Sequence, residues 1–262
     1  MTHNLLKSLA KRRRKAILEA QKLQGNGADA VCHKWLGAAG PARADACIIT
    51  MMKDDADIIQ EYLSWHLRLG FRHFIIFDNG SVDGGRDLVI ATRQRWPDAD
   101  ILLIDDPSLA YYQDRKMTGL ALLAEKLWPS VRWIFPIDTD EFLCLPDNLA
   151  SGLQRLESAA VDIGYIPYYN TNQLADGSPL DESVPFHERQ LWRRARIEDV
   201  KVVFKAGCVT KIHMGNHDVD TSMIWERRGD GLAAGMTYRH YPARSLTHLR
   251  RKVVNGGQAP AP

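Results

Sequence analysis

Three carboxylates stand close together in the stretch VRWIFPIDTDEFLCL, which spans residues 131–145. Asp138, Asp140 and Glu141 follow a run of apolar residues, and apolar residues resume directly after them. Burying an unpaired ion is energetically costly, so such a cluster needs a compensating partner. Carboxylate oxygens suit Mg²⁺ or Mn²⁺, and these ions keep coordination positions open for water and substrate phosphates. The stretch therefore predicts a divalent metal site that could stabilise a departing diphosphate.

Buried strands and amphipathic helices must position these carboxylates. Short apolar runs predict four buried strands, and helical spacing of apolar residues between them predicts three helices. The strands are expected at 46–52, 73–78, 100–106 and 132–138, and the helices at 55–70, 84–96 and 114–128. This alternation predicts an α/β fold with a mostly parallel central sheet flanked by helices. Two further strands are expected at 161–170 and 200–213.

Polar residues follow each of the four predicted strands. They include Lys53, Asp54 and Asp55 after the first strand, Asp78 after the second, Asp105 and Asp106 after the third, and residues 138–141 after the fourth. Ligands of such sheets bind beyond the carboxyl ends of the strands. Four acidic strand ends at one edge indicate a site for a metal and a negatively charged ligand. The competing interpretation is a set of polar turns closed by local hydrogen bonds.

The composition is that of an ordinary soluble globular protein. The chain has 262 residues, of which 45% are hydrophobic and 25% charged, and its net charge of +2 gives no argument for nucleic-acid binding. The four cysteines lie far apart without a CxxC pair, which favours a reducing compartment. No apolar segment is long enough to span a bilayer, and the first residues lack the apolar core of a signal peptide. We therefore expect a cytoplasmic protein.

The first 44 residues differ in character from the rest. Helix-forming residues fill 3–24, a basic run lies at 11–15, and glycines at 25 and 27 would end the helix. We expect residues 1–44 to form a basic helical extension and linker. A basic helix with an apolar edge could rest on an anionic membrane surface, which predicts a peripheral role for residues 1–24. The alternative is a solvated helix or one packed on the domain.

Two stretches together resemble a known family. MMKDDADIIQEYLSWHLRLGFRHFIIFDNGSVDG at 51–84 and WIFPIDTDEFL at 133–143 resemble the glycosyltransferase family 2-like group, close to the subgroup that is similar to family 92. The segments 200–217 and 239–257 resemble later, looser motifs of that group, so the resemblance covers about residues 46–257. Asp54 and Asp55 replace the usual Asn-Glu pair, which leaves the contact with the base open.

The resemblance implies a GT-A fold and a metal-dependent glycosyltransferase. Such an enzyme would move a sugar from a nucleotide donor, expected to be UDP-linked, to a glycan or lipid-linked acceptor, as in polysaccharide biosynthesis. It further implies a catalytic domain at 45–262, with a nucleotide-binding half at about 45–145 and an acceptor half at about 146–262. The cofactor would be Mn²⁺ or Mg²⁺.

The resemblance also assigns roles to individual residues. Lys53, Asp55, Asp78 and Asp138 are expected at the nucleotide. Asp138 would contact the ribose or a metal-bound water, and Asp140 would ligate the metal. Glu141 would orient Asp140 or a basic neighbour. For Asp78 the alternative is an Asx-turn that opens the sequence DNGS.

The acceptor half offers further candidates. His217 is expected at the metal or the diphosphate, with His213 as its competitor and a surface histidine as the alternative for either. His240 is expected to be structural or to face the acceptor. Lys201, Arg244 and Lys252 could meet phosphate, although basic residues in loops are usually solvated. Glu188 is preferred as general base over three other acidic residues, Asp199, Asp218 and Glu226. Three aromatic residues, Tyr168, Tyr169 and Trp192, could stack on a sugar or lie in the core.

Two other functions remain open on the sequence. The first is a protein that binds a sugar nucleotide without turning it over, which the replaced Asn-Glu pair allows. The second is a phosphotransferase with an aspartyl nucleophile. That class carries its two aspartates after the first strand, whereas here they follow the fourth.

Overall fold

The computed structural model describes residues 45–106, 112–172, 192–193 and 199–245, together with the single residues 15, 197, 248 and 250 and the pair 252–253. The expected helical extension at 1–44, apart from residue 15, and the base candidate Glu188 lie outside the described residues. The described chain forms a mixed α/β structure around one ten-stranded sheet. Among the described residues, none of the helices is both long and apolar enough to cross a membrane.

The first half of the sheet has the predicted parallel arrangement. Its strands are β1 (Ala46–Met52), β2 (His73–Asp78), β3 (Asp100–Asp105) and β4 (Trp133–Pro136), in the spatial order β3-β2-β1-β4. The helices between them are α3 (Ile59–Leu69), α4 (Gly85–Arg95) and α5 (Gln113–Leu127). All seven elements confirm the sequence prediction to within a few residues. Their carboxyl ends meet at one edge, as parallel pairing requires.

The second half of the sheet adds antiparallel pairs, so the sheet as a whole is mixed. Strand β8 (Asp199–Lys205) runs antiparallel both to β4 and to β6 (Ile163–Asn172). Strand β12 (Thr237–His240) runs parallel to β6 and antiparallel to β5 (Glu141–Cys144). The short strands β7 (Trp192–Arg193) and β11 (Arg228–Asp230) also pair with β6. Strand β8 is thus antiparallel to both of its neighbours, whereas β11 and β12 run parallel to β6.

The expected strand at 200–213 is two strands. A turn at Ala206 and Gly207 ends β8, and Gly207 adopts a φ of +78° that favours glycine. The chain then forms β9 (Lys211–Ile212), the 3₁₀ turn η2 (Met214–Asn216) and β10 (Val219–Asp220). Strands β9 and β10 pair with each other in a small second sheet. The η2 turn between them returns to the carboxylate edge of the large sheet.

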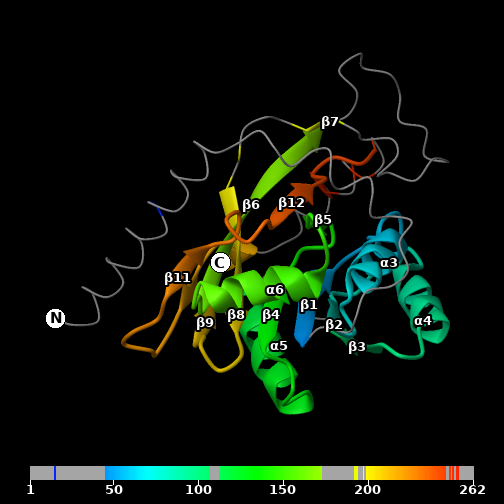
Figure 1. The fold of residues 1–262 in the computed structure, drawn as a ribbon. Helices are drawn as coiled ribbons and strands as arrows, with labels where there is room; N and C mark the ends of the chain where they lie inside the picture. The colour runs from blue at the N-terminus through cyan, green and yellow to red at the C-terminus, as the bar shows by residue number, and fades with distance from the viewer. Residues whose placement is uncertain are drawn as a thin grey trace.

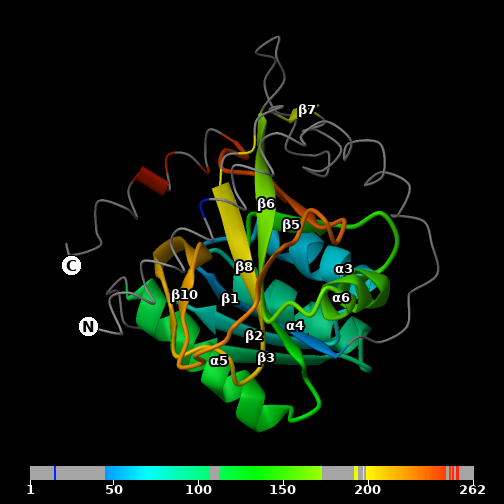
Figure 2. The same ribbon diagram turned by 60° about the vertical axis from the view of Figure 1, so that its left-hand side comes forward.

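Two apolar clusters cover the two faces of the sheet. Helices α3, α4 and α6 (Leu149–Ser158) pack on one face, and α5 packs on the other, as Figures 1 and 2 show. Side chains of a strand alternate between these faces. In β8, Val200 and Val202 belong to the cluster on the α5 face, whereas Val203 belongs to the opposite cluster. Lys201 therefore extends from the same face of the sheet as Val203.

Candidate functional site

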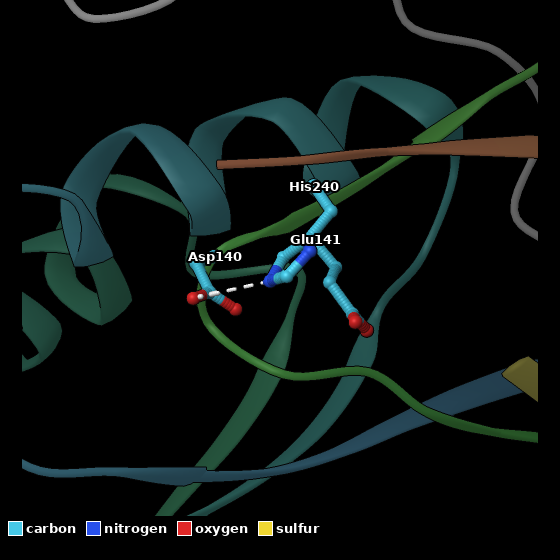
Figure 3. Close-up of side chains that lie close together, drawn as sticks. All are labelled: Asp140, Glu141 and His240. Atoms are coloured by element: carbon cyan, nitrogen blue, oxygen red, sulfur yellow. Dashed lines mark ion pairs between the residues drawn. The ribbon is translucent and has the colours of Figure 1, made fainter. Parts of the chain in front are cut away.

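Asp140, Glu141 and His240 meet at the edge of the sheet. Asp140 lies in the turn between β4 and β5, Glu141 begins β5, and His240 ends β12. The antiparallel pairing of β5 with β12 places His240 directly opposite Glu141. One potential ligand atom from each of the three side chains lies within 4.8 Å of the others. Figure 3 shows the Asp140 carboxylate facing the His240 imidazole.

Positive groups surround the Asp140 carboxylate. Its Oδ2 atom lies 3.0 Å from Lys252 Nζ and 3.5 Å from His240 Nε2. Burial by itself raises the pKa of Asp140, but His240, Lys252 and Arg244 together hold it well below its usual value. Burial by itself lowers the pKa of His240, but Asp140 and Glu141 together raise it above its usual value. Asp140 is therefore an ionised carboxylate that favours a cationic neighbour.

Lys201 pairs with Asp138 and Glu141, the other two carboxylates of the stretch 138–141. Its Nζ atom lies 2.7 Å from Asp138 Oδ2, 2.8 Å from Glu141 Oε1 and 2.7 Å from the carbonyl oxygen of Gly215. The side chain of Glu141 is 1% exposed, and its other oxygen accepts the backbone N–H of Asp138 at 3.2 Å. Burial raises the pKa of Glu141 to about 7 even though Lys201 opposes this effect.

Asp138 is held from three directions. Besides Lys201, the side-chain amides of Asn216 and Gln113 donate to its Oδ1 atom at 3.0 and 3.3 Å. Gln113 lies at the start of α5, and Asn216 lies in η2, so Asp138 connects the strand end to both elements. Asn216 itself is fully buried and adopts a φ of +57°. The side chain of Asp138 is therefore fixed in orientation before any ligand binds.

Asp55, another predicted nucleotide residue, contacts the stretch 138–141 directly. It accepts a hydrogen bond from Thr139, the residue between the two aspartates, at 2.8 Å. Burial raises the pKa of Asp55, and the nearby Arg244 guanidinium opposes that rise. Lys53 Nζ donates at 3.2 Å to the carbonyl oxygens of Asn79 and Gly80, so it closes the loop after β2.

Asp78 is occupied within its own turn. One of its oxygens accepts the backbone N–H of Ser81, three residues on, at 3.0 Å, which closes a local turn although the spacing is one residue longer than in an Asx-turn. The other accepts Arg86 Nη1 at 2.7 Å. Arg86 also pairs with Asp105 at the end of the neighbouring strand. The buried Asp78 therefore joins the ends of β2 and β3.

The structure places the predicted histidines differently from the sequence expectation. His217 Nδ1 lies 2.7 Å from the carbonyl oxygen of Val200, and His217 does not belong to the group formed by Asp140, Glu141 and His240. His213 pairs with Asp220 at 3.1 Å and is 43% exposed. His240, which was expected to be structural or to face the acceptor, is the histidine beside Asp140. The ring of Tyr168 lies between the two histidines, 5.3 Å from that of His240 and 6.1 Å from that of His217.

The remaining candidates are dispersed. Asp218 binds the hydroxyl of Tyr165 at 2.8 Å and Arg228 at 2.8 Å, and Glu226 pairs with the same arginine at 3.3 Å. Tyr169 is buried. The side chain of Trp192 lies outside the described residues. Arg244 and Lys252, expected either to meet phosphate or to be solvated, bind Asp55 and Asp140 respectively.

The sequence is similar to proteins of one glycosyltransferase family. No family model matches the chain. An alignment of 110 positions, covering 39% of this chain, is 28% identical to a glycosyltransferase family 92 protein of Oryza sativa subsp. japonica. A family 92 protein of Ricinus communis is 26% identical over an alignment of the same length. The chain spans only 16% and 17% of the length of these two relatives.

Two solved structures are similar at lower identity. The mannosyltransferase PcManGT from Pyrobaculum calidifontis, in complex with GDP-Man and Mn²⁺, is 15% identical with a TM-score of 0.40, over 60% of this chain and 45% of that chain. The mannosyltransferase Ktr4p from S. cerevisiae, in complex with GDP, is 9% identical with a TM-score of 0.32, over 60% of this chain and 48% of that chain. The chain is thus similar, over part of its length, to glycosyltransferase family 92 proteins, as its motifs indicate.

Proposed function

We propose that this protein is a metal-dependent glycosyltransferase that moves a sugar from a nucleotide-sugar donor to a hydroxyl of a glycan or lipid-linked acceptor. The observation that carries the proposal is the pairing of Asp140 with His240 at the carboxyl edge of the parallel half-sheet. Ligands of open α/β sheets bind at this edge. The similarity to family 92 proteins supports the same function.

The chemistry of the side chains fits a divalent ion. Asp140 offers a carboxylate oxygen and His240 an imidazole nitrogen, and this donor pair suits Mn²⁺ better than Mg²⁺. When bound, the ion would act as a Lewis acid on the donor diphosphate. Glu141 is less available, because its two oxygens already accept Lys201 and the backbone of Asp138. We infer that Asp140 and His240 are the ligands and that Glu141 positions its neighbours.

Other residues of the site would bind and orient the donor. Lys252 is about half exposed and shares Asp140 Oδ2 with His240, so it is placed to exchange this carboxylate for a donor phosphate. The Asp138 carboxylate, held by Asn216 and Lys201, lies next to the proposed metal ligands and would accept a hydrogen bond from a ribose hydroxyl. Tyr168 offers an aromatic face between His217 and His240, which suits stacking on a sugar ring. The general base stays assigned to Glu188.

Nucleotide release from a panel of donors tests this function. The purified full chain should release nucleoside diphosphate slowly from one UDP-sugar or another donor in the panel, which includes GDP-sugars, with water as the acceptor. Release should require Mn²⁺ or Mg²⁺ and stop with EDTA. Undiminished release in EDTA would overturn the metal-dependent reaction. Tight metal-dependent binding without turnover, with any acceptor glycan offered, would instead favour a protein that only binds the donor.

The proposal includes a cytoplasmic location with peripheral contact to the inner face of the membrane. The basic run at 11–15 within residues 1–24 supports it, because anionic lipids attract clustered lysine and arginine. Co-sedimentation with anionic liposomes compares the full chain with a chain that starts at Asp29. Equal sedimentation of the two chains would reject the membrane contact and leave the proposed reaction untouched.

A further inference from the structure

We propose that Lys201 is a built-in cation, whose ammonium group fills an oxygen-lined position beside the proposed metal ligands. In consequence, the centre would take up one exchangeable divalent ion, at Asp140 and His240, and not two. This inference rests on the proposed function, because it needs a metal at Asp140. Lys201 would be a positioning residue, since it acts on the site through Asp138 and Glu141.

The surroundings of the Lys201 ammonium resemble a cation site. Its three N–H groups have three acceptors, the carboxylates of Asp138 and Glu141 and the carbonyl oxygen of Gly215, at 2.7 to 2.8 Å. These oxygens come from two separate segments of the chain, the stretch from 138 to 141 and the η2 turn. Two carboxylates and a carbonyl are also ligands that hard divalent cations take, at roughly 2.0–2.6 Å. A metal ion could therefore occupy the same oxygens after a small contraction.

Lys201 is a buried charged residue, and its position suggests that the charge is needed to neutralise Asp138 and Glu141. The side chain is 5% exposed, and it extends from the face of β8 that also carries the apolar Val203. Well-packed apolar residues often replace a buried ion pair without loss of stability. An apolar residue at position 201, however, would leave the buried Glu141 and the neighbouring Asp138 as two adjacent carboxylates without their shared counter-charge. The Lys201 ammonium binds both side chains and holds them in one fixed arrangement.

Lys252 provides the contrast within the same cluster. Its side chain is 48% exposed, and its Nζ atom reaches one carboxylate oxygen, on Asp140, and the carbonyl oxygen of Pro242. Little desolvation is needed for Lys252 to leave, so an arriving metal ion can displace it. Lys201 is not displaced in this way, because its ammonium is buried and bound to three acceptors. The two lysines therefore divide the cluster into one exchangeable cation position and one permanent one.

The stoichiometry of Mn²⁺ binding tests this division. Calorimetric titration and electron paramagnetic resonance should show one Mn²⁺ ion in the wild-type protein. Lys201→Ala should bind two ions and show the spectrum of a spin-coupled pair, because it frees the three oxygens. Lys252→Ala is the matched control and should bind one ion, more tightly than the wild type. Lys201→Arg, which keeps the charge, should also bind one ion.

Turnover gives a second measurement. Lys201→Ala should lose at least tenfold in turnover with either metal, and Lys201→Arg should recover part of that loss. A double variant, Lys201→Ala with Glu141→Ala, should return to one ion, because the second position then lacks a carboxylate. Circular dichroism confirms that each variant is folded.

Two results would overturn the inference while the proposed function stands. They are two Mn²⁺ ions in the wild-type protein, and a single ion in a folded Lys201→Ala variant. The first is measured on the unaltered chain, so it does not depend on the folding of any variant. A wild-type protein that binds no Mn²⁺ at all would overturn the proposed function itself, and the exchangeable position with it.

Discussion

Arg244 forms a bidentate ion pair with Asp57, in which Nε donates to Oδ2 at 2.8 Å and Nη2 donates to Oδ1 at 3.0 Å. The two residues are 187 positions apart in the sequence. Asp57 lies just before α3, and Arg244 lies just after β12, so this contact ties the end of the described chain to its beginning. The same guanidinium donates to Asp55 at 2.8 Å. Because Asp55 also accepts a hydrogen bond from Thr139, Arg244 is connected to the stretch 138–141.

Removing this guanidinium should destabilise the fold. Arg244 is 2% exposed in its side chain, so Arg244→Met leaves Asp55 and Asp57 without their main counter-charge. We expect the free energy of unfolding to fall by about 3 kcal/mol, measured by urea titration. Arg132→Met is the control, because the Arg132 side chain is 62% exposed and its pair with Glu157 should contribute less than about 1 kcal/mol. Equal effects of the two substitutions would contradict the structural role of Arg244.

Asp140→Asn should greatly weaken metal-dependent nucleotide binding without unfolding the protein. The substitution keeps the size of the side chain but removes the charged oxygen that faces His240 and Lys252. Calorimetric titration with UDP or GDP in the presence of Mn²⁺ should show affinity lowered at least tenfold. Asp100→Asn, at the opposite end of the parallel strands, should bind like the wild type. Unchanged affinity in a folded Asp140→Asn variant would remove Asp140 from the metal site.

The two histidines beside Tyr168 should differ in their effect on the metal. His240→Ala removes an imidazole that reaches Asp140, and we expect Mn²⁺ affinity to fall at least tenfold. His217→Ala should leave Mn²⁺ affinity within about twofold, because its ring lies against Val200 outside the ligand group. Both variants are read by the same Mn²⁺ titration. A larger loss in His217→Ala than in His240→Ala would restore the assignment that the sequence motifs favour.

Metal binding should release a proton and strengthen as the pH rises. His240 must lose its proton to bind a metal ion, and in the metal-free protein its pKa is raised by Asp140 and Glu141. Below that raised pKa, Mn²⁺ competes with the proton, and affinity should fall by up to about tenfold per pH unit. Asp140 stays ionised across this range, because its pKa is lowered. Calorimetry in two buffers of different ionisation enthalpy counts the protons, and no release would contradict this role of His240.

Stability should fall in mild acid because of His66. Burial lowers the pKa of His66 to about 3, so between that value and the ordinary 6.5 the unfolded chain binds a proton that the folded chain does not. Stability from this group is therefore complete above pH 6.5 and declines, by up to about 1.4 kcal/mol per pH unit, as the pH falls. His66→Gln should flatten the pH dependence of unfolding measured by urea titration between pH 4 and 7. The same pH dependence of the free energy of unfolding in the wild type and in His66→Gln would refute this role of His66.

The parallel half of the fold follows from the sequence because its signals are local. Apolar runs mark β1 to β4, and the spacing of apolar residues marks α3, α4 and α5. Helix α6 is not among the predicted helices, and Gly152 lies within it. A Cβ atom at Gly152 would come within 2.8 Å of Met236 and 2.9 Å of Leu145, so close packing explains the glycine. That reason exists only in the folded structure.

The partners of the carboxylates are less predictable than the carboxylates themselves. The sequence singles out Asp138, Asp140 and Glu141 because their spacing behind an apolar run is visible. The approach of His240 depends on the pairing of β5 with β12, whose residues are about a hundred positions apart. The approach of Lys201 depends on antiparallel pairing of β8, which periodicity alone does not reveal. Until the strand pairing is known, the sequence cannot tell which histidine near a strand end lies beside the carboxylates.

The antiparallel pairing of β5 with β12 also has a consequence for protein synthesis. The chain leaves the ribosome from its N-terminus, so Asp140 and Glu141 emerge long before His240 and Lys252. Until β12 joins the sheet, Asp140 lacks the imidazole and ammonium that neutralise it in the finished protein. The cluster is therefore assembled last, although its acidic residues are made early. An incomplete chain that ends before residue 237 would carry the acidic motif without the histidine needed to complete the proposed metal centre.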